Sequence, residues 1–369
     1  MTLLGSDGQG LAACVDPDLH EVLEGAAPAR ASDVHIAAGS PPLYRIDGRL
    51  RSVSSESWGS AKVEQALYSL LSPLQAAQFD AEHELDLAFT LQSGRRIRVN
   101  LFRERGAVAA AVRVVSTTIP SLDELSLPPQ VARFADMPRG LVLVTGPTGM
   151  GKSTTLAAIV DRINRTHAKH IMTIEDPIEF VHTSARSLVQ QREVGTDTKS
   201  FAEALRRLLR QDPDVIMVSD LRDLESIQFA LEAADTGHLV LATLHTQSAA
   251  QTINRIVDVF SGSQQAQVRA QLSTALKGVI SQTLVPVASG VGRIPAVEIM
   301  FTSPAIANLI REGRTHQIPS AMVTSGEDGM ITLDQSLAHL VNQGTLEFEA
   351  AIARAYDVET FRQLTHRWA

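Results

Sequence analysis

The sequence has 369 residues, of which 44% are hydrophobic and 4% aromatic, a composition typical of a soluble protein of two or three domains. Its 41 acidic and 33 basic side chains give a formal net charge of −8, which argues against a protein dedicated to binding nucleic acid, because such proteins usually carry a basic face. Cys14 is the only cysteine, which excludes a disulfide within the chain and a zinc site built from several thiolates.

The first 29 residues are polar, rich in alanine and glycine and weakly patterned, which predicts a loosely structured leader with one short helix. No basic segment precedes their short apolar stretch, so we expect no signal peptide. No apolar run in the chain approaches the ~18–20 residues of a membrane span, so we expect no transmembrane segment. These features predict a cytoplasmic protein that reaches a membrane surface only through a partner.

Residues 30–116 are expected to form a small α+β domain with an antiparallel sheet, because short alternating apolar runs are separated by turn residues. Asp47-Gly48 is a strong hairpin signal between two of these runs. The expected elements of this domain are strands at 32–36, 43–46, 85–91, 96–101 and 107–115 and a helix at 61–80. Residues 117–139 are expected to be a linker with a short helix.

Residues 140–302 alternate strand and helix patterns, which predicts a mostly parallel sheet with helices on both faces. The expected strands are 141–145, 170–175, 214–219, 238–244 and 293–300, and the expected helices are 151–167, 200–211, 223–236 and a long one at 264–285. From Ser303, an N-cap residue followed by Pro304, the tail predicts a bundle of about four short helices.

A phosphate-binding loop follows the strand at 141–145. Its residues match G-x-x-x-x-G-K-[ST] and continue into a helix; they are Gly146, Pro147, Thr148, Gly149, Met150, Gly151, Lys152, Ser153 and Thr154. Glycines let backbone N–H groups approach phosphate oxygens, and the positive end of the helix adds a field of the right sign. Lys152 is expected to reach the β- and γ-phosphates, and the Ser153 hydroxyl to hold Mg²⁺. A purely structural glycine turn is the alternative, but it would not require the lysine and the serine.

Acidic side chains follow two other strands. The segment Glu-Asp-Pro-Ile-Glu occupies residues 175–179, and Asp220 ends the strand at 214–219. The carboxyl ends of parallel strands form the edge where ligands bind, and phosphoryl transfer to water needs a metal ligand and a group that orients the water. For a single acid, a capping role is an equal alternative. The phosphate loop in the same sheet favours a functional role.

Two histidines bracket the strand at 238–244. His245 lies at the end where ligands gather, so we expect it to sense the γ-phosphate, although a lone histidine is more often structural. His238 lies at the other end, and organising the strand start or a subunit contact are its alternatives.

At these residues the chain resembles the type IV pilus retraction ATPases, a branch of the secretion ATPase superfamily. The resemblance runs from about residue 31 to 364 and rests on five segments: ASDVHIAAGSPPLYRIDGRL at 31–50, the phosphate loop, ITIEDPIEFVH with the downstream QREVGTDTKSFAEALRRLLRQDPDVIMV, TGHLVLATLHT at 236–246 and PAIANLIREG at 304–313. The acidic box together with the histidine box is highly specific to this superfamily.

The resemblance implies an N-terminal PAS-like α+β domain at 30–116, a RecA-like ATPase core at 140–302 and a C-terminal helical region at 303–369. It implies a homo-hexameric ring that hydrolyses ATP with Mg²⁺ and sits in the cytoplasm, peripheral to the inner membrane through the pilus machinery. The implied partners are an inner-membrane platform protein and a paralogous retraction ATPase, with no nucleic acid. The AIANLIRE segment corresponds to one that retraction enzymes need.

The resemblance also implies roles for individual residues. Lys152 and Ser153 correspond to the ligands of phosphate and Mg²⁺, Glu179 to the catalytic base, and Asp220 to the acid beside the metal. The two histidines match the histidine box, with His238 expected among the nucleotide-binding groups. Arginines that act on ATP, some across subunit interfaces, correspond to Arg98, Arg113 and Arg139. A guanidinium suits a dispersed transition-state charge, although surface roles would otherwise be expected for these arginines.

One departure from the family pattern bears on activity. The family usually has Gly-Glu where this chain has Ser219-Asp220, so the carboxylate falls short by about one C–C bond length, ~1.5 Å. A misplacement near 1 Å can cost about a hundredfold in rate. Met150 replaces a smaller residue at a position where we expect little effect.

Three other functions stay open. The shorter Asp220 is compatible with a weakly hydrolysing scaffold or accessory ring subunit of the pilus machinery. A pilus-assembly or secretion ATPase is another alternative, but such enzymes commonly carry a tetracysteine zinc module that a chain with one cysteine cannot form. A DNA-translocating ring is weaker still, because no basic stripe supports it.

Overall fold

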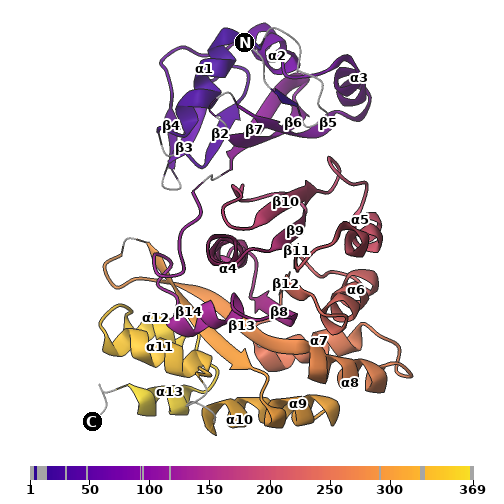
Figure 1. Cartoon of the computed structure of the whole chain (residues 1–369). Coiled ribbons are helices and arrows are strands. Elements are labelled where there is room, and N and C mark those ends of the chain that lie inside the picture. Colours follow the sequence, from indigo (N-terminus) through magenta and orange to yellow (C-terminus); the bar gives the residue numbers. More distant parts are fainter. Residues whose placement is uncertain are drawn as a thin grey trace. The chain divides into compact units, whose positions relative to one another are not determined.

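The computed structural model describes residues 4–5, 15–29, 31–46, 49–91, 93, 95–115, 118–290, 292–324 and 329–365. It divides into two compact units, each described by itself below (Figure 1). Unit 1 comprises Met1–Thr118 and Glu179–Val181, and unit 2 comprises Ile119–Ile178 and His182–Ala369. Within the described ranges, no helix combines the length and the apolar character that crossing a membrane requires. Cys14 and the hairpin residues Asp47 and Gly48 lie outside the described residues.

Unit 1 is built on a seven-stranded sheet in the order β1-β5-β6-β7-β2-β3-β4, in which every pairing is antiparallel, as expected. Its strands are β1 (Leu4–Gly5), β2 (Asp33–Ile36), β3 (Leu43–Ile46), β4 (Arg49–Ser52), β5 (Glu84–Thr90), β6 (Arg96–Glu104) and β7 (Ala107–Val114). Its helices are α1 (Pro17–Ala26), α2 (Ser60–Tyr68) and α3 (Pro73–Glu82).

The single helix expected at 61–80 is therefore two helices. Ser72 begins the second one as its N-cap: its hydroxyl accepts a hydrogen bond from the Gln75 N–H, and the Gln75 side chain accepts one from the Ser72 N–H. Pro73 follows in the first turn, where a residue without an N–H is tolerated. This capping box interrupts an otherwise continuous helical pattern.

Helix α1 shows that the end of the expected leader is ordered. Asp16 caps the helix by accepting hydrogen bonds from two backbone N–H groups of the first turn. Leu19 and Leu23 are almost completely buried in the core of unit 1. The leader was expected to be loose with one short helix, and α1 is such a helix. It differs from the expectation in being part of the fold of unit 1, because its apolar side chains recur at helical spacing and pack into the core.

Unit 2 contains a second seven-stranded sheet, in the order β10-β9-β11-β12-β8-β13-β14. All neighbours are parallel except β13 and β14, which confirms the expected mostly parallel sheet. The strands are β8 (Gly140–Thr145), β9 (His170–Glu175), β10 (Leu188–Glu193), β11 (Val215–Val218), β12 (Leu239–Leu244), β13 (Leu276–Pro286) and β14 (Arg293–Phe301). Strand β10, at the edge of the sheet, was not expected from the sequence.

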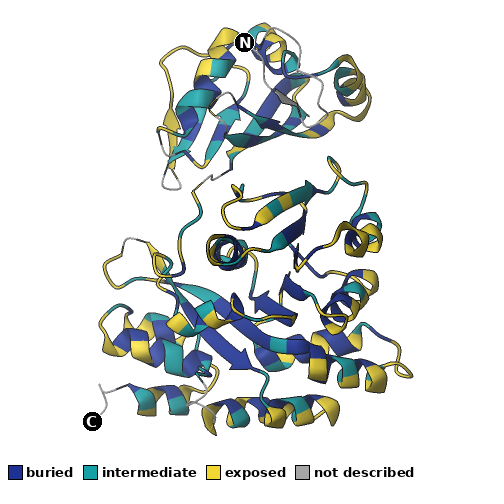
Figure 2. Ribbon diagram, in the orientation of Figure 1, coloured by how far each residue is buried: buried dark blue, intermediate teal, exposed yellow. Residues whose placement is uncertain are grey.

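The helices of the core cover both faces of this sheet: α4 lies on one side, and α5 and α6 lie on the other (Figure 1). The core helices are α4 (Lys152–Thr166), α5 (Phe201–Leu208), α6 (Leu224–Asp235), α7 (Ala249–Asp258) and α8 (Gln265–Ala275), with 3₁₀ turns at Pro129–Phe134 and Leu209–Gln211. Every residue of β8, β11 and β12 is buried, as Figure 2 shows. Such uniformly apolar strands are typical of parallel sheets covered on both faces.

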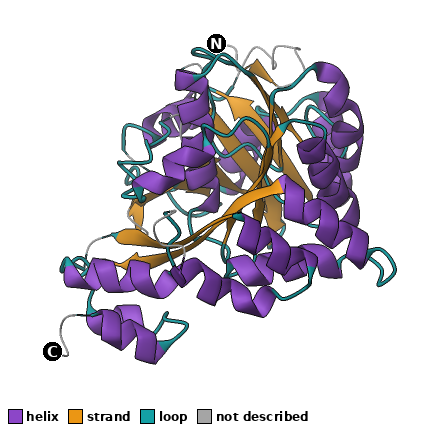
Figure 3. Ribbon diagram, turned by 60° about the horizontal axis from the view of Figure 1, so that its bottom comes forward, coloured by secondary structure: helices purple, strands orange, loops and turns teal. Residues whose placement is uncertain are grey.

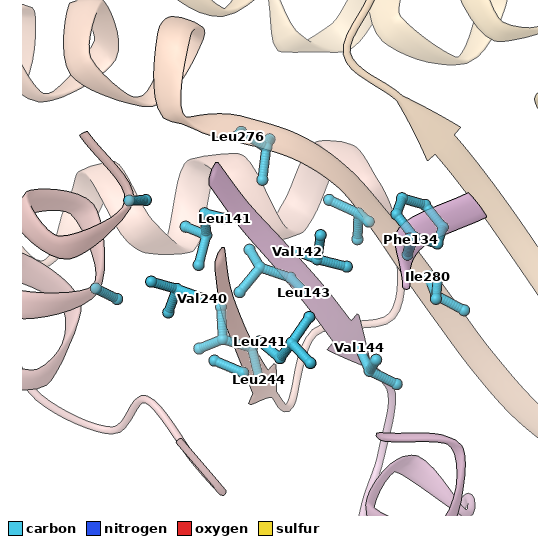
Figure 4. Packing of buried hydrophobic residues seen from close by; sticks show 14 of the residues in the cluster. Phe134, Leu141, Val142, Leu143, Val144, Val240, Leu241, Leu244, Leu276 and Ile280 are labelled. Carbon is cyan, nitrogen blue, oxygen red and sulfur yellow. The ribbon is translucent and has the colours of Figure 1, made fainter. Parts of the chain in front are cut away.

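Figure 4 shows the centre of this core. Leu141 and Leu143 of β8 pack between Val240 of β12 and Leu276 of β13. All four side chains are completely buried, so β8, the strand that leads to the phosphate loop, is packed against both of its neighbours.

The prediction of one long helix at 264–285 is wrong beyond residue 275. Helix α8 ends at Ala275, and the next eleven residues form β13, which pairs with β8 on one side and β14 on the other. Residues 278–282 of β13 are all buried, and a segment that is buried on both faces has no period that separates strand from helix. Gly278 fits the strand, because a Cβ there would lie 2.4 Å from the Met300 carbonyl oxygen.

The C-terminal region contains five helices and a 3₁₀ turn among its described residues, close to the expected bundle (Figure 3). They are α9 (Pro304–Arg311), α10 (Ile318–Thr324), α11 (Leu333–Asn342), α12 (Phe348–Ile352), α13 (Val358–Leu364) and the turn Thr315–Gln317. In the AIANLIRE segment Ile306 and Ile310 are completely buried, whereas Arg311 and Glu312 are exposed.

Candidate active site

The phosphate loop adopts a backbone that its glycines make possible. Gly146, Gly149 and Gly151 all have positive φ angles, of 144°, 78° and 80°. At Gly146 the space is also closed, since a Cβ would lie 2.3 Å from the carbonyl oxygen of Gln282. Gly151 is the N-cap of α4, and no side chain caps this helix. The backbone N–H groups of its first turn are therefore available to an anion.

Strand β13 is hydrogen-bonded to the phosphate loop. The Gln282 side chain donates to the Met150 carbonyl at 2.7 Å and accepts from the Thr155 hydroxyl at 2.7 Å. The Met150 sulfur accepts a hydrogen bond from the Leu284 N–H at 3.3 Å. Met150 thus ties the loop to β13, although we expected this position to matter little. Sequence reasoning missed Gln282, because it placed this residue in a helix.

Lys152 is the buried cation of the loop. Its side chain is 7% exposed, and its Nζ donates to the Pro147 carbonyl at 3.0 Å. The same Nζ lies 3.5 Å from Nδ1 of His245, which follows the end of β12. The ammonium is therefore placed over the loop, where a polyphosphate would lie, and Ser153 and Thr154 occupy the adjacent first turn of α4.

Asp220 lies just beyond the end of β11 and is 7% exposed. Its Oδ2 accepts from Nε of Arg222 at 2.7 Å and lies 3.0 Å from Nε2 of His245. Its Oδ1 is buried and has no hydrogen-bond partner among the described residues. The hydrogen bond to Asp220 raises the pKa of the Arg222 guanidinium further. Sequence reasoning missed Arg222, whose position two residues after an acid gives no distinctive signal.

The structure thus brings three predicted site residues together: Lys152, His245 and Asp220. The imidazole of His245 contacts the lysine with one nitrogen and the carboxylate with the other. The three residues lie close together because β11, β12 and β8 are parallel neighbours that end at the same edge of the sheet. A cation over a glycine loop, with a carboxylate one imidazole away, can hold a polyphosphate and an associated metal.

The acids of the 175–179 segment have different surroundings. Glu175 is 4% exposed, and its Oε1 accepts from the Thr173 hydroxyl at 2.7 Å and from the Gln191 amide at 2.9 Å. Asp176 and Glu179 are exposed, and the Asp176–Pro177 peptide bond is cis. Glu179 groups with unit 1, whereas the phosphate loop belongs to unit 2.

A buried histidine lies close after this segment. His182 is 8% exposed, and burial lowers the pKa of its imidazole from 6.5 to about 4. Its backbone N–H donates to the Gln191 side chain at 2.7 Å, and that amide in turn donates to Glu175. The imidazole is therefore neutral at neutral pH. Through Gln191, the backbone of His182 is linked to Glu175 of the acidic segment.

The three predicted arginines lie on other elements than Lys152. Arg98 and Arg113 are paired neighbours on β6 and β7 in unit 1. Arg113 donates from Nε to Asp33 at 3.0 Å. Arg139 belongs to unit 2 but directly precedes β8, so the whole strand separates it from the phosphate loop, a distance of roughly 20 Å for six residues.

His238 also lies at the edge opposite the phosphate loop. It precedes β12, and its carbonyl accepts from the N–H of Gly140 at the start of β8 at 2.9 Å. Its Nδ1 is 3.0 Å from the Ala233 carbonyl oxygen. His238 and His245 therefore lie at opposite ends of β12, and the nucleotide-binding role expected of His238 stays a prediction. Its alternative role at the strand start fits these contacts.

The residues present fit a magnesium ion that arrives with a nucleotide. Among the described residues no three His, Cys, Asp or Glu side chains gather into a ready-made metal site. Mg²⁺ usually takes one or two protein ligands and fills its shell with phosphate oxygens and water. The unpartnered, buried Oδ1 of Asp220 and the Ser153 hydroxyl at the start of α4 are donors of the required kind.

Comparison with known proteins identifies what this chain is similar to. Residues 9–308 match the family model described as type II/IV secretion system protein. The chain is 48% identical over 344 residues to the type IV pilus retraction ATPase PilT of Pseudomonas aeruginosa, which covers 93% of this chain and 100% of that protein. It is 47% identical over 319 residues to the twitching motility protein of Neisseria gonorrhoeae, covering 86% and 85% of the two chains.

The fold has a close counterpart among solved structures. The crystal structure of the pilus retraction motor PilT with bound ADP superimposes with a TM-score of 0.87 at 44% sequence identity. The match covers 93% of this chain and 98% of that one.

Proposed function

The chain belongs to the family of type II/IV secretion system proteins, and on this premise we propose that it is an ATPase that drives retraction of type IV pili. The observation that carries the proposal is the cluster in which His245 joins Lys152 of a glycine-shaped phosphate loop to the buried Asp220. The relatives named for pilus retraction and twitching motility support the same activity over nearly the whole chain.

The phosphate loop binds the nucleotide in this proposal. Backbone N–H groups at Gly149, Gly151 and the uncapped start of α4 face the phosphates, and Lys152 exchanges its bond to the Pro147 carbonyl for the β- and γ-phosphate oxygens. When Lys152 moves, His245 loses its contact with the lysine. Because His245 also contacts Asp220, the position of the lysine is coupled to the position of this carboxylate.

Hydrolysis then requires an acid that orients water. A water molecule attacks the γ-phosphorus in line with the bridging oxygen, that bond breaks, and Glu179 accepts the proton of the water. When bound, Mg²⁺ supplies positive charge beside the phosphates, and the Ser153 hydroxyl and the free Oδ1 of Asp220 would hold it. Glu175 is a poorer candidate for the base, because its Oε1 already accepts two hydrogen bonds inside the protein.

We infer that the working unit is a homo-hexameric ring in the cytoplasm, held at the inner membrane by the platform protein of the pilus machinery. In this ring Arg98, Arg113 and Arg139 are proposed to act on ATP, some of them across subunit interfaces. A paralogous retraction ATPase is a further partner. The exposed Arg311 and Glu312 of the AIANLIRE segment are the surface proposed to face a neighbour.

One observation favours a second candidate, an accessory ring that binds ATP and hydrolyses it weakly. Asp220 has a shorter side chain than the glutamate usual in the family, and its Oδ2 is occupied by Arg222 and His245. Retraction of labelled pili in live cells separates the two. We expect cells that lack this protein, or that carry Lys152→Ala, to extend pili that fail to retract, whereas Lys199→Ala, a change at an exposed lysine, should retract normally. Normal retraction in the Lys152→Ala cells would favour the accessory ring.

A further inference from the structure

Strands β9 and β11 lead to the two acidic parts of the site, and they are parallel neighbours. Val218 pairs with Ile174, and the Ser219 N–H donates to the Ile174 carbonyl at 3.0 Å as the last bond of the ladder. Beyond this point the two strands continue into separate loops. The two loops are still joined, because the Asp176 N–H donates to the Ser219 hydroxyl at 3.2 Å.

A second link joins the same two loops. Arg222 binds Asp220 through Nε at 2.7 Å, and its other end lies 3.7 Å from the carboxylate of Asp176. Asp176 therefore meets the loop of Asp220 twice, with its N–H and with its carboxylate. An exposed ion pair at 3.7 Å is weak by itself, so the hydrogen bond from a fixed backbone N–H is the more defined of the two links.

Ser219 is also held from the other side. Its carbonyl accepts from the Thr243 hydroxyl, and the Thr243 carbonyl accepts from the Leu221 N–H at 3.0 Å. These two bonds fix the backbone of residues 219–221 against β12, the strand that leads to His245. The Ser219 hydroxyl thus projects from a backbone that is hydrogen-bonded to β12.

We propose that Ser219 is a positioning residue of this ATPase, whose hydroxyl, assisted by Arg222, fixes Asp176 and the start of the acidic segment, residues 175–178, relative to Asp220. The inference rests on the proposed function. A glycine, which the resemblance to the retraction ATPases leads us to expect at this position, would have no side-chain atom to make the contact. The serine therefore adds a hydrogen bond at the residue next to Asp220.

The consequence concerns geometry rather than affinity. Catalysis depends on the relative placement of the acid that orients water and the acid beside the metal, and an error of about 1 Å costs up to a hundredfold in rate. One neutral hydrogen bond contributes only about 1 kcal/mol, so its loss shifts the population of the aligned loop without unfolding it. ATP binding at the phosphate loop uses none of these atoms.

Amide hydrogen exchange tests the contact directly in the nucleotide-free protein. We expect the peptide that contains the Asp176 N–H to exchange about threefold to tenfold faster in Ser219→Ala than in wild type, because this N–H loses its acceptor. Ser219→Thr keeps the hydroxyl and should protect the segment as the wild type does. Ser320→Ala, at an exposed serine of α10, is the matched control and should change nothing in this segment.

Steady-state hydrolysis tests the consequence. We expect Ser219→Ala to lower kcat about threefold to tenfold with KM for ATP unchanged, and Ser219→Thr to stay within about twofold of wild type. A Ser219→Ala enzyme with wild-type exchange and wild-type kcat would overturn the proposal, and so would equal losses in the alanine and threonine variants. If wild type hydrolyses no faster than Lys152→Ala, the proposed function itself fails. An active wild type with an unaffected Ser219→Ala defeats only the positioning role.

Discussion

Glu179 and Glu175 show how residue surroundings separate two acids of the same motif. Glu179 is exposed, whereas Glu175 is buried and its Oε1 accepts from Thr173 and Gln191. Substitution of the first should therefore affect chemistry, and substitution of the second should affect folding. This difference could not be read from the sequence, where both acids follow the same strand.

We predict that Glu179→Gln lowers kcat about a hundredfold or more while ATP binding stays within about threefold of wild type, because the amide cannot accept the proton of the attacking water. Single-turnover hydrolysis and equilibrium binding of ATP measure the two quantities. Glu349→Gln, at an exposed acid of α12, is the control. Near-normal turnover in Glu179→Gln would move the base to Glu175.

Glu298 is a buried acid outside the site. It is 5% exposed on β14, accepts from the Ala249 N–H at 2.7 Å, and burial raises the pKa of its carboxyl from 4.5 to about 7. Asp334 adds to this shift, and burial raises the pKa of Asp334 as well. Glu298 therefore binds a proton in the folded state at pH values where the unfolded chain has released it.

A group whose pKa is raised by folding contributes stability that is complete below its unfolded pKa and is lost as the pH rises through its folded pKa. We predict that wild type loses up to about 3 kcal/mol relative to Glu298→Gln between pH 4.5 and 7, with no further loss above. His182, whose pKa is lowered by burial, acts in the opposite direction over a similar range. Chemical denaturation of wild type and Glu298→Gln at each pH gives the difference between their free energies of unfolding, in which the contribution of His182 cancels. Parallel stability curves for the two proteins would contradict the prediction.

At the scale of elements, the phosphate loop and β13 form one structural piece. Gly146 lies against the Gln282 carbonyl, and the Gln282 side chain holds the Met150 carbonyl. The shape of the loop therefore depends on a strand more than a hundred residues away in sequence, and a side chain at Gly146 would push the two apart.

We predict that Gly146→Ala lowers stability by about 3 kcal/mol or more and abolishes ATP binding, because the new Cβ would lie 2.3 Å from a backbone oxygen at a φ of 144°. Gly195→Ala is the matched control: its φ of 87° is also positive, but a Cβ there meets nothing within 4 Å. It should cost only about 1 kcal/mol. Thermal unfolding and ATP titration measure both effects, and equal losses in the two variants would refute the steric argument.

Local pattern predicted the elements whose signal is local. The strand at 141–145 leads into the phosphate loop, and helix α4 follows it as expected. The strand at 170–175 is present as expected and ends in the acidic segment. Strand β13 was mistaken for helix, because burial on both faces removes its period. Strand β10 was missed, because an edge strand with polar side chains has no apolar alternation.

The sequence predicted those site residues whose positions follow from the ends of the parallel strands. The parallel order of the sheet places Asp220, His245 and the phosphate loop at one edge, and the same order places His238 and Arg139 at the other. Arg222, Gln282 and the Ser219 contact could not be predicted, because each depends on which side chains meet after the loops have folded. These are also the residues that orient the predicted ones.

At the scale of the whole molecule, the chain carries its candidate groups on both units. Lys152, His245 and Asp220 belong to unit 2, whereas Glu179, Arg98 and Arg113 group with unit 1. The phosphate loop of unit 2 binds the nucleotide in the proposed function, so every other candidate group depends on this loop for its substrate.

The most direct test of the account is steady-state ATP hydrolysis by the purified full-length protein with Mg²⁺, wild type against Lys152→Ala. We predict measurable turnover in wild type and a loss of at least about a hundredfold in Lys152→Ala, since the variant lacks the cation for the β- and γ-phosphates. Lys199→Ala, an exposed lysine, should retain wild-type turnover. Equal rates in wild type and Lys152→Ala would contradict the claim that this loop, with His245 and Asp220, hydrolyses ATP.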